Sequence, residues 1–382
     1  MMTSLLLATL LLSALLLSWV AERIGLPAVV GQIGAGLVLG PAGFAFINST
    51  ITIDHWAEIG VILLMFLAGI ESDLSLLKAH LKKSIAVALA GVVTPFIIFY
   101  VFGVLLHYSH EQALLWAVLF SATSVSITAQ VLTEYRQLKS DAGSTILGAA
   151  VIDDLLAVMM WTIFQASFGI GGQQKFGLGL TLFFMLAYLV GLLLFLAFFL
   201  PKLLPVLARI SQPGLILTVV FALLLFTAHF AEAVGLSGAI VAFLIGLLFT
   251  KLPGKEGIEH GMILVGNVVF IPVFFANIGL KVSWAGQLGH LWLIVLLTVL
   301  AIWTKWAGPY LAARLMHMTK HSANVVGVGM VSRGEMALVI ANLALSAKVL
   351  EDSLYGAFVL VILLTTVFTP IVLKPLLKGK NN

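Results

Sequence analysis

The sequence predicts an all-α polytopic membrane protein, and three observations lead to that fold class. The chain of 382 residues is 61% hydrophobic and only 9% charged, whereas a soluble domain carries about 25% charged residues. Its apolar runs are far longer than the roughly 10-residue alternating segments of a transmembrane barrel. In lipid, a helix satisfies every backbone hydrogen bond within its own segment, so helical spans are the natural solution.

Thirteen apolar runs approach the length of about 20 residues that a helix needs to cross the hydrocarbon core. They fill the chain, so we expect one membrane-embedded domain over 1–382 and no soluble regulatory domain. The expected spans are 3–21, 27–47, 56–76, 84–107, 112–133, 142–168, 176–200, 214–231, 235–250, 260–280, 288–313, 322–347 and 354–373.

Positively charged residues indicate the orientation of these spans. With an odd number of spans, the two termini lie on opposite sides of the membrane. If the C-terminus is cytoplasmic, only Lys175, Lys281 and Lys348 lie in outer loops, and Lys305 and Arg333 fall within spans. All other basic residues then lie inside, as the positive-inside rule requires. We expect a multi-pass protein of the cell (inner) membrane with its N-terminus outside and its C-terminus in the cytoplasm.

An internal repeat relates the two halves of the chain. Residues 22–40 align without a gap with 232–250, and 66–70 match 274–278 at nearly the same offset. Chance similarity between two apolar runs is the alternative, but two segments in register argue against it. The offset shifts each span by an odd number of spans, so the second copy is inverted in the membrane.

Inverted repeats are the architecture of many secondary transporters, whose sites lie near the bilayer midplane between the repeats. We therefore expect the same arrangement here. The predicted units are repeat 1 over about 3–168, a linker helix over about 176–200 and repeat 2 over about 214–373.

Charged residues inside spans are costly in lipid and are functional by default. Asp153 and Asp154 lie midway along the span 142–168, in an otherwise uncharged stretch. Neighbouring residues project about 100° apart on a helix, so we expect the two carboxylates to have different partners. Lys305, inside 288–313, is the obvious partner for one of them. The alternative is that its side chain snorkels to the membrane interface.

Arg333 and Glu335 form a second charged group, inside the span 322–347 and beside several glycines. Glycine and charge together in an apolar run indicate a broken helix whose free backbone groups line a cavity. A local Arg–Glu pair that only stabilises packing is the alternative.

The repeat extends this prediction to the span 112–133. Ser332 corresponds there to Ser124, in a cluster of hydroxyl residues that reads FSATSVSIT. Hydroxyls and unwound carbonyls are oxygen ligands that suit a hard cation such as Na⁺. This span contains no glycine or proline, so its break is expected from symmetry alone. The alternative is that these hydroxyls only join neighbouring helices.

Several other functions are excluded by missing motifs. The chain has no cysteine, which removes disulfides, thiolate metal sites and cysteine nucleophiles. It has no P-loop and no H-E-x-x-H sequence. An intramembrane aspartic protease needs its two carboxylates on different helices, whereas Asp153 and Asp154 are adjacent on one. We expect a protein that is not an enzyme, that contacts membrane lipid and that binds neither nucleic acid nor nucleotide.

The residues described so far resemble those of the cation:proton antiporter superfamily. Ile-Asp-Asp-Leu at 152–155, Lys305, Ser-Arg-Gly-Glu at 332–335 and the thirteen-span layout are similar to the monovalent cation:proton antiporter 2 family, and to its NapA-type sodium/proton antiporters in particular. The resemblance covers essentially the whole chain. It implies two inverted repeats, a core and a dimerisation domain, two crossed broken helices, a homodimer and no cofactor beyond the transported Na⁺ and H⁺.

The resemblance also implies roles for individual residues. Asp154 would bind Na⁺ and the proton in turn, and Asp153 would pair with Lys305. Thr123 and the backbone around Ser124 would help to bind the ion. Glu335 would lie near the helix crossing.

These roles predict an antiporter in which Na⁺, with Li⁺ as a further candidate, competes with protons for Asp154 under alternating access. If Lys305 also releases its proton when Asp153 joins the ion site, two protons move per cation and exchange is electrogenic. Two alternatives remain open. One is K⁺/H⁺ exchange on the same fold. The other is a cation channel or a sensor, whose flux would not be coupled to protons.

Overall fold

The computed structural model describes residues 2–24, 26–168, 178–208, 214–234, 236–250, 252, 254–282, 291–346 and 348–378. Within these ranges every regular element is helical, which confirms the predicted fold class. The helices are α1 (Met2–Arg23), α2 (Ala28–Leu39), α3 (Ile51–Glu71), α4 (Leu74–Ala79), α5 (Leu81–Leu105), α6 (His110–Ser121), α7 (Val125–Glu134), α8 (Asp141–Phe168), α9 (Leu178–Ala208), α10 (Leu215–Ala233), α11 (Gly238–Phe249), α12 (Lys255–Val265), the π-helical turn η1 (Gly266–Phe270), α13 (Ile271–Leu280), α14 (Leu291–Leu315), α15 (Lys320–Gly329), α16 (Glu335–Ser346) and α17 (Asp352–Lys378).

The described residues contain ten helical segments long and apolar enough to cross a membrane, and three shorter apolar helices. Each coincides with one of the expected spans, although the number of true crossings stays a prediction. The expected span 27–47 is too long, because its helix ends at Leu39 and the backbone becomes extended at Gly40. The expected span 56–76 is displaced, because Thr50 caps α3 by accepting from the N–H of Ile53 and the helix ends at Glu71.

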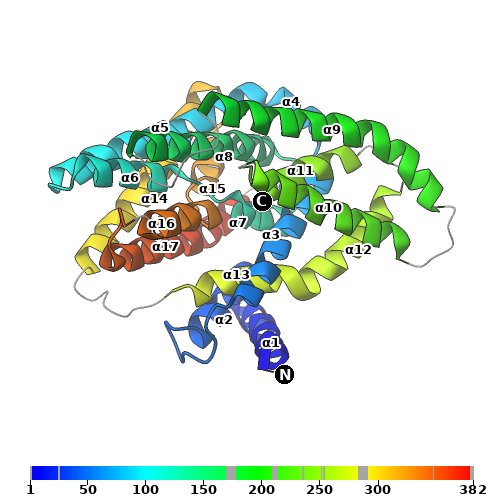
Figure 1. Cartoon of the computed structure of the whole chain (residues 1–382), viewed down its shortest axis with the longest axis horizontal. Helices are drawn as coiled ribbons and strands as arrows, with labels where there is room; N and C mark the ends of the chain where they lie inside the picture. The colour runs from blue at the N-terminus through cyan, green and yellow to red at the C-terminus, as the bar shows by residue number, and fades with distance from the viewer. Residues whose placement is uncertain are drawn as a thin grey trace.

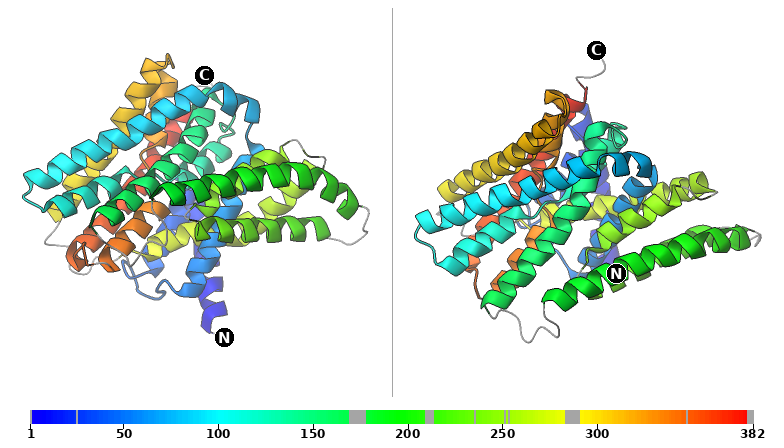
Figure 2. Two further views of the ribbon diagram at one scale, coloured as in Figure 1. Left: turned by 45° about the horizontal axis from the view of Figure 1, so that its top comes forward. Right: turned by 90° about the horizontal axis from the view of Figure 1, so that it is seen from above.

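The helices form two groups, and each group takes helices from both halves of the chain (Figures 1 and 2). The scaffold group packs α1, α2 and α3 against α10, α11 and α13. The core group packs α5, α6 and α8 against α14, α15 and α17. The main contacts between the groups are made by α7 with α2 and α3, and by α17 with α2.

Glycines let the scaffold helices approach until their backbones touch. A Cβ at Gly36 of α2 would collide with the carbonyl of Ala276 on α13, and a Cβ at Gly246 of α11 would collide with the carbonyl of Phe66 on α3. The same offset in residue number relates Gly36 to Gly246 and Phe66 to Ala276. This reciprocity is expected of two repeats related by a twofold axis, and it supports the predicted repeat. The pairs Gly279–Ile33 and Gly69–Phe243 obey the same rule.

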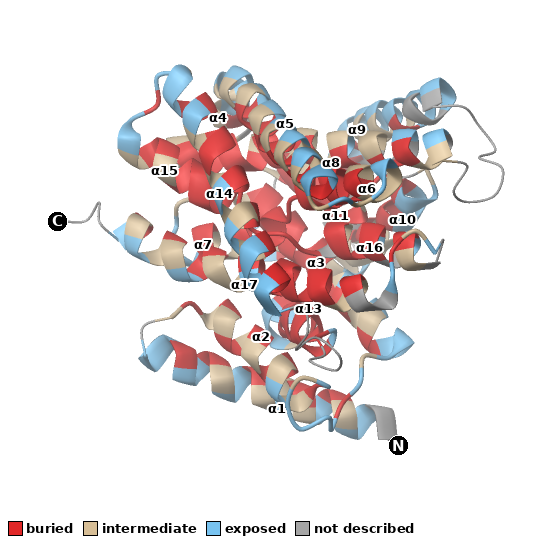
Figure 3. Cartoon of the chain, turned by 90° about the vertical axis from the view of Figure 1, so that its left-hand side faces the viewer, coloured by how far each residue is buried: buried red, intermediate tan, exposed pale blue. Residues whose placement is uncertain are grey.

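The buried share of each span distinguishes helices that face lipid from helices that lie in the interior of the protein. The segment that contains α6 and α7 is buried over most of its length, whereas α1 and α9 bury only a small part of theirs. Figure 3 shows the buried residues concentrated at the centre of the molecule and the exposed ones along α1 and the outer helices. Asp153 and Lys305 lie on the inward faces of α8 and α14, where both side chains are fully buried although these helices expose their other faces.

Candidate ion- and proton-binding site

Two interrupted helices meet at the centre of the core group, as the repeat predicts. The first breaks between Ser121, where α6 ends, and Val125, where α7 begins, with Ala122 in an extended conformation. The second breaks between α15 and α16. At the meeting point the N–H of Ser124 donates to the carbonyl of Ser332 over 2.9 Å, and the hydroxyl of Ser332 donates to the carbonyl of Ser124. Each break thus satisfies polar groups that the other leaves without a helical partner.

Asp153 and Lys305 are brought together beside this crossing. The Nζ of Lys305 lies 3.4 Å from Oδ2 of Asp153, and the two side chains are 0% and 1% exposed respectively. Lys305 also donates to the hydroxyl of Thr123, which in turn hydrogen-bonds to Asp153. Full burial of Lys305 rules out snorkelling to the membrane interface. A buried pair of this kind survives only because each charge compensates the other.

One carboxylate oxygen of the Asp153–Lys305–Thr123 group accepts no hydrogen bond within the part of the chain that the structure describes. Oδ1 of Asp153 is buried and has no hydrogen-bond partner among the residues that the structure describes. Buried polar atoms are nearly always satisfied, so an open acceptor within a charged cluster requires an explanation. This oxygen is suited to accept a cation or a proton.

Asp154 differs from its neighbour in exposure. It is half-buried on α8, whereas Asp153 is fully enclosed. It lies close enough to Lys305 for their charges to interact. The adjacent carboxylates therefore have different surroundings, as their angular separation on the helix requires.

Arg333 holds the broken helices by binding backbone carbonyls. Its guanidinium donates to the carbonyl of Phe120 through Nε (3.1 Å) and Nη2 (2.9 Å). It also donates to the carbonyls of Ala301 (3.1 Å) and Val331 (3.2 Å). Phe120 is in the last turn of α6, where carbonyls lack helical partners and a cation is favoured by the helix dipole. Ala301 lies one turn before Lys305 on α14, so Arg333 connects both sides of the site.

Two further hydroxyl residues of the cluster, Thr128 and Ser121, donate hydrogen bonds to backbone carbonyls of neighbouring helices. Thr128 donates to the carbonyl of Gly329 over 2.6 Å, and Ser121 donates to carbonyls of Ala117 and Val92. These contacts are those that the interhelical alternative predicts for the two residues. The side chain of Glu335 and all of Lys175 lie outside the described residues.

Sequence reasoning missed Thr366, whose hydroxyl donates to the backbone carbonyl of Arg333. The sequence offers only three threonines, Thr365, Thr366 and Thr369, in the largely apolar span 354–373, and nothing in it indicates which backbone group each one binds.

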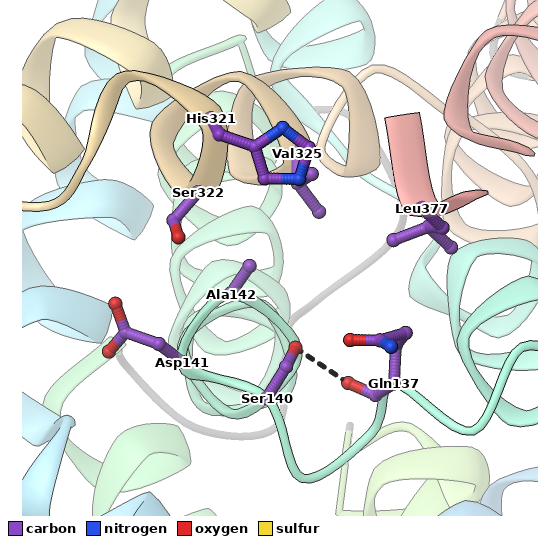
Figure 4. Close-up of a pocket in the computed structure, with 8 residues that line it drawn as sticks. All are labelled: Gln137, Ser140, Asp141, Ala142, His321, Ser322, Val325 and Leu377. Atoms are coloured by element: carbon purple, nitrogen blue, oxygen red, sulfur yellow. Dashed lines mark hydrogen bonds between the residues drawn. The ribbon is translucent and has the colours of Figure 1, made fainter. Parts of the chain in front are cut away.

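A pocket at one end of the core group is separate from this site (Figure 4). It lies between the first turns of α8 and α15, and the Asp141 carboxylate there binds Lys83 at 2.8 Å. The pocket-lining residues are Gln137, Ser140, Asp141, Ala142, His321, Ser322, Val325 and Leu377.

Comparison with known proteins places this geometry in a family. The model of the family described as "Sodium/hydrogen exchanger, transmembrane" matches residues 11–379. The chain belongs to the sodium/hydrogen exchanger family. This exchanger is 37% identical over 358 residues to a Na⁺/H⁺ antiporter of Enterococcus hirae, with 94% of this chain and 93% of the relative covered. It is 35% identical over 367 residues to the Na⁺/H⁺-K⁺ antiporter GerN of Bacillus cereus, with coverage of 96% and 94%.

The fold of this exchanger also matches a solved structure. The sodium proton antiporter MjNhaP1 of Methanocaldococcus jannaschii superposes with a TM-score of 0.70 at 16% sequence identity, over 99% of this chain and 96% of that one. At 16% sequence identity, this match supports a shared fold and nothing about function. The exchanger is thus a multi-pass membrane protein with the antiporter fold.

Proposed function

We propose that this exchanger moves Na⁺ in one direction and protons in the other, with Asp154 as the carboxylate for which they compete. The observation that carries this proposal is the half-buried Asp154 beside the enclosed Asp153–Lys305–Thr123 group at the crossing of two broken helices. Ionised, Asp154 binds the cation; protonated, it does not. Coupling then follows from one carboxylate that serves both ions in turn.

The neighbouring group provides a route to a second proton. When the cation enters, the open Oδ1 of Asp153 offers it an oxygen, and hard cations are bound by oxygen ligands. A cation there repels the ammonium of Lys305, which lies 3.4 Å from the other carboxylate oxygen. Release of a proton from Lys305 would make the exchange two protons per cation and therefore electrogenic.

Two further features of the proposal concern the assembly and the domains. The core group would move against the scaffold group, which would form the dimer, as inverted-repeat transporters rock one unit around a fixed site. The reciprocal glycine contacts support a rigid scaffold. We place the repeats at about 3–168 and 214–373, with α9 as the linker.

K⁺/H⁺ exchange is a second candidate function. It is favoured by one observation, the 35% identity to a relative whose name includes K⁺ as well as Na⁺. The oxygen ligands at the crossing do not by themselves distinguish the two cations.

The test is collapse of a pH gradient in everted membrane vesicles, followed with a fluorescent dye as Na⁺ or K⁺ is added. Wild type should dissipate the gradient with Na⁺, and Asp154→Asn should not. Asp141→Asn is the matched control, because it makes the same change on the same helix at a half-buried ion pair with Lys83, away from the helix crossing. A response to K⁺ alone would favour the second candidate, and no response to either cation across pH 6–9 would refute exchange.

A further inference from the structure

The scaffold span formed by α12, η1 and α13 carries a polar side chain in its middle. The three elements follow one another without a gap from Lys255 to Leu280 (Figure 1). Asn267 lies at the midpoint of these 26 residues, and no other polar side chain occurs between His260 and Asn277. A span of this length therefore places the Asn267 amide near the centre of the hydrocarbon core.

The Asn267 amide points outward and has no partner in its own chain. The residue is exposed, and its side chain makes no hydrogen bond with the residues that the structure describes. The other asparagine of this span differs, because Asn277 is buried, donates to Asp54 over 2.7 Å and accepts from Ser49 over 2.9 Å. An amide in hydrocarbon is costly until another polar group pairs with it.

The backbone around Asn267 adds a second polar group at the same depth. Asn267 lies in the π-helical turn η1, where the N–H of Ile271 donates to the carbonyl of Gly266, five residues earlier. Pro272 follows and has no N–H, so a carbonyl in the turn before it lacks a helical donor. The equivalent scaffold helix of the first repeat, α3, is α-helical over its 21 residues. The π-turn is therefore not imposed by the repeat, and such turns are frequent at functional sites.

Apolar side chains surround the amide on the exposed face of this span. Leu264, Val265 and Val268 are 53%, 41% and 65% exposed. A lipid headgroup lies about 15 Å away from the bilayer centre, and lipid tails offer neither donor nor acceptor. Only another polypeptide can therefore pair with the amide at this depth, and asparagine is one of the residues that hydrogen-bond between helices in membranes.

The chemistry of the amide indicates which polypeptide fits. A carboxamide has both an acceptor oxygen and donor N–H groups, so two identical carboxamides are complementary to each other. In a twofold dimer the same patch of each subunit meets itself. A twofold axis along the membrane normal also pairs equal residues at equal depth, so Asn267 meets the partner's Asn267.

We propose that Asn267 lies at the twofold axis of a homodimer, where its amide hydrogen-bonds to that of a second copy and Leu264 and Val268 pack around the pair. The pairing deepens the scaffold dimer put forward under the proposed function and rests on it. A single buried asparagine pair fixes the register of two apolar helices. It would thus hold the two scaffold groups in one relative position while the core groups move.

Cysteine cross-linking tests the position of the interface. The chain has no cysteine, so a single Leu264→Cys variant, which keeps the amide, reports on one site. In membranes treated with the lipid-soluble oxidant copper–phenanthroline, it should form a disulfide-linked dimer on a non-reducing gel. Val299→Cys is the matched control, because Val299 is 60% exposed on α14 of the core group. No dimer from Leu264→Cys, or as much from Val299→Cys, would overturn the pairing.

The monomer–dimer equilibrium tests the amide itself. In analytical ultracentrifugation in density-matched detergent, Asn267→Leu should raise the dissociation constant of the dimer about tenfold, and Asn267→Gln should raise it less. Thr298→Val, which removes a hydroxyl bonded within α14, should leave it unchanged. An unchanged or lower constant in Asn267→Leu would overturn the pairing. A monomeric wild type would overturn it together with the scaffold dimer, whereas collapse of the pH gradient by Na⁺ reports separately on exchange at Asp154.

Discussion

Ser124 and Ser332, 208 residues apart, hydrogen-bond to each other in both directions at the helix crossing. One bond uses the N–H of Ser124 and the other uses its carbonyl, so the two breaks act as each other's caps. The crossing is thereby fixed by the backbone as well as by side chains. The charged groups of the site are held around this point, and most of the following predictions depend on it.

Removing one of these bonds should weaken the crossing. Ser332→Ala deletes the hydroxyl that donates to Ser124, and a buried hydrogen bond is worth about 1 kcal/mol. We expect a lower melting temperature in detergent and a slower maximal rate of exchange. Ser72→Ala is the matched control, because its buried hydroxyl donates to the carbonyl of Ala68 at the end of α3, away from the crossing. It should lower stability without changing the rate, and an equal loss of rate in both variants would contradict the account.

Arg333 should not be replaceable by lysine. A single ammonium cannot reach the carbonyls of Phe120, Ala301 and Val331 together, as the planar guanidinium does. Charged hydrogen bonds contribute about 1.5–3 kcal/mol each, so we expect Arg333→Lys to be strongly destabilised and inactive. Thermal denaturation and vesicle transport measure the two effects. Near wild-type activity in Arg333→Lys would show that charge alone is sufficient.

Lys305 should determine whether exchange responds to membrane voltage. About 2.3 kcal/mol per net charge is available from each 100 mV, so an imposed potential should accelerate wild type. Lys305→Gln cannot transport the second proton, so the rate of its residual exchange should not depend on the membrane potential. Because the variant leaves Asp153 buried without its cation, it should also be unstable. The double variant Lys305→Gln/Asp153→Asn should recover much of that stability, and its failure to do so would argue against the pairing.

The stability of the scaffold group should fall when a methyl group is added at Gly36 or Gly246, the glycines of the reciprocal contacts. A Cβ at Gly36 or Gly246 would strike backbone carbonyls, and overpacking typically costs about 1–3 kcal/mol. We expect Gly36→Ala and Gly246→Ala to lower the melting temperature by similar amounts. Gly34→Ala, on the same helix as Gly36 but with no atom within 4 Å, should be neutral or stabilising. A Gly34 variant as damaging as the Gly36 variant would reject the packing argument.

Much of this architecture is predictable from sequence because lipid limits the choices. Long apolar runs require helices, and the repeat locates a break in the span 112–133 that no glycine or proline marks. Asp153, Asp154 and Lys305 stand out because charge within a span is rare. The carbonyl partners of Arg333 and the role of Thr366 are not predictable, because backbone acceptors have no sequence signal. The limits of α2 also depend on tertiary contacts, such as the close approach of Gly36 and Gly40 to α13.

Competition between Na⁺ and protons for Asp154 is the central claim, and steady-state kinetics across pH test it most directly. The apparent KM for Na⁺ should rise at least tenfold for each pH unit once the site binds protons, because a proton displaces the cation from Asp154 and the second proton, on Lys305, steepens the dependence further. The maximal rate at saturating Na⁺ should stay constant over the same range. A maximal rate that falls with pH while the KM stays constant would contradict the account, since protons would then act at a site other than the one that binds the cation.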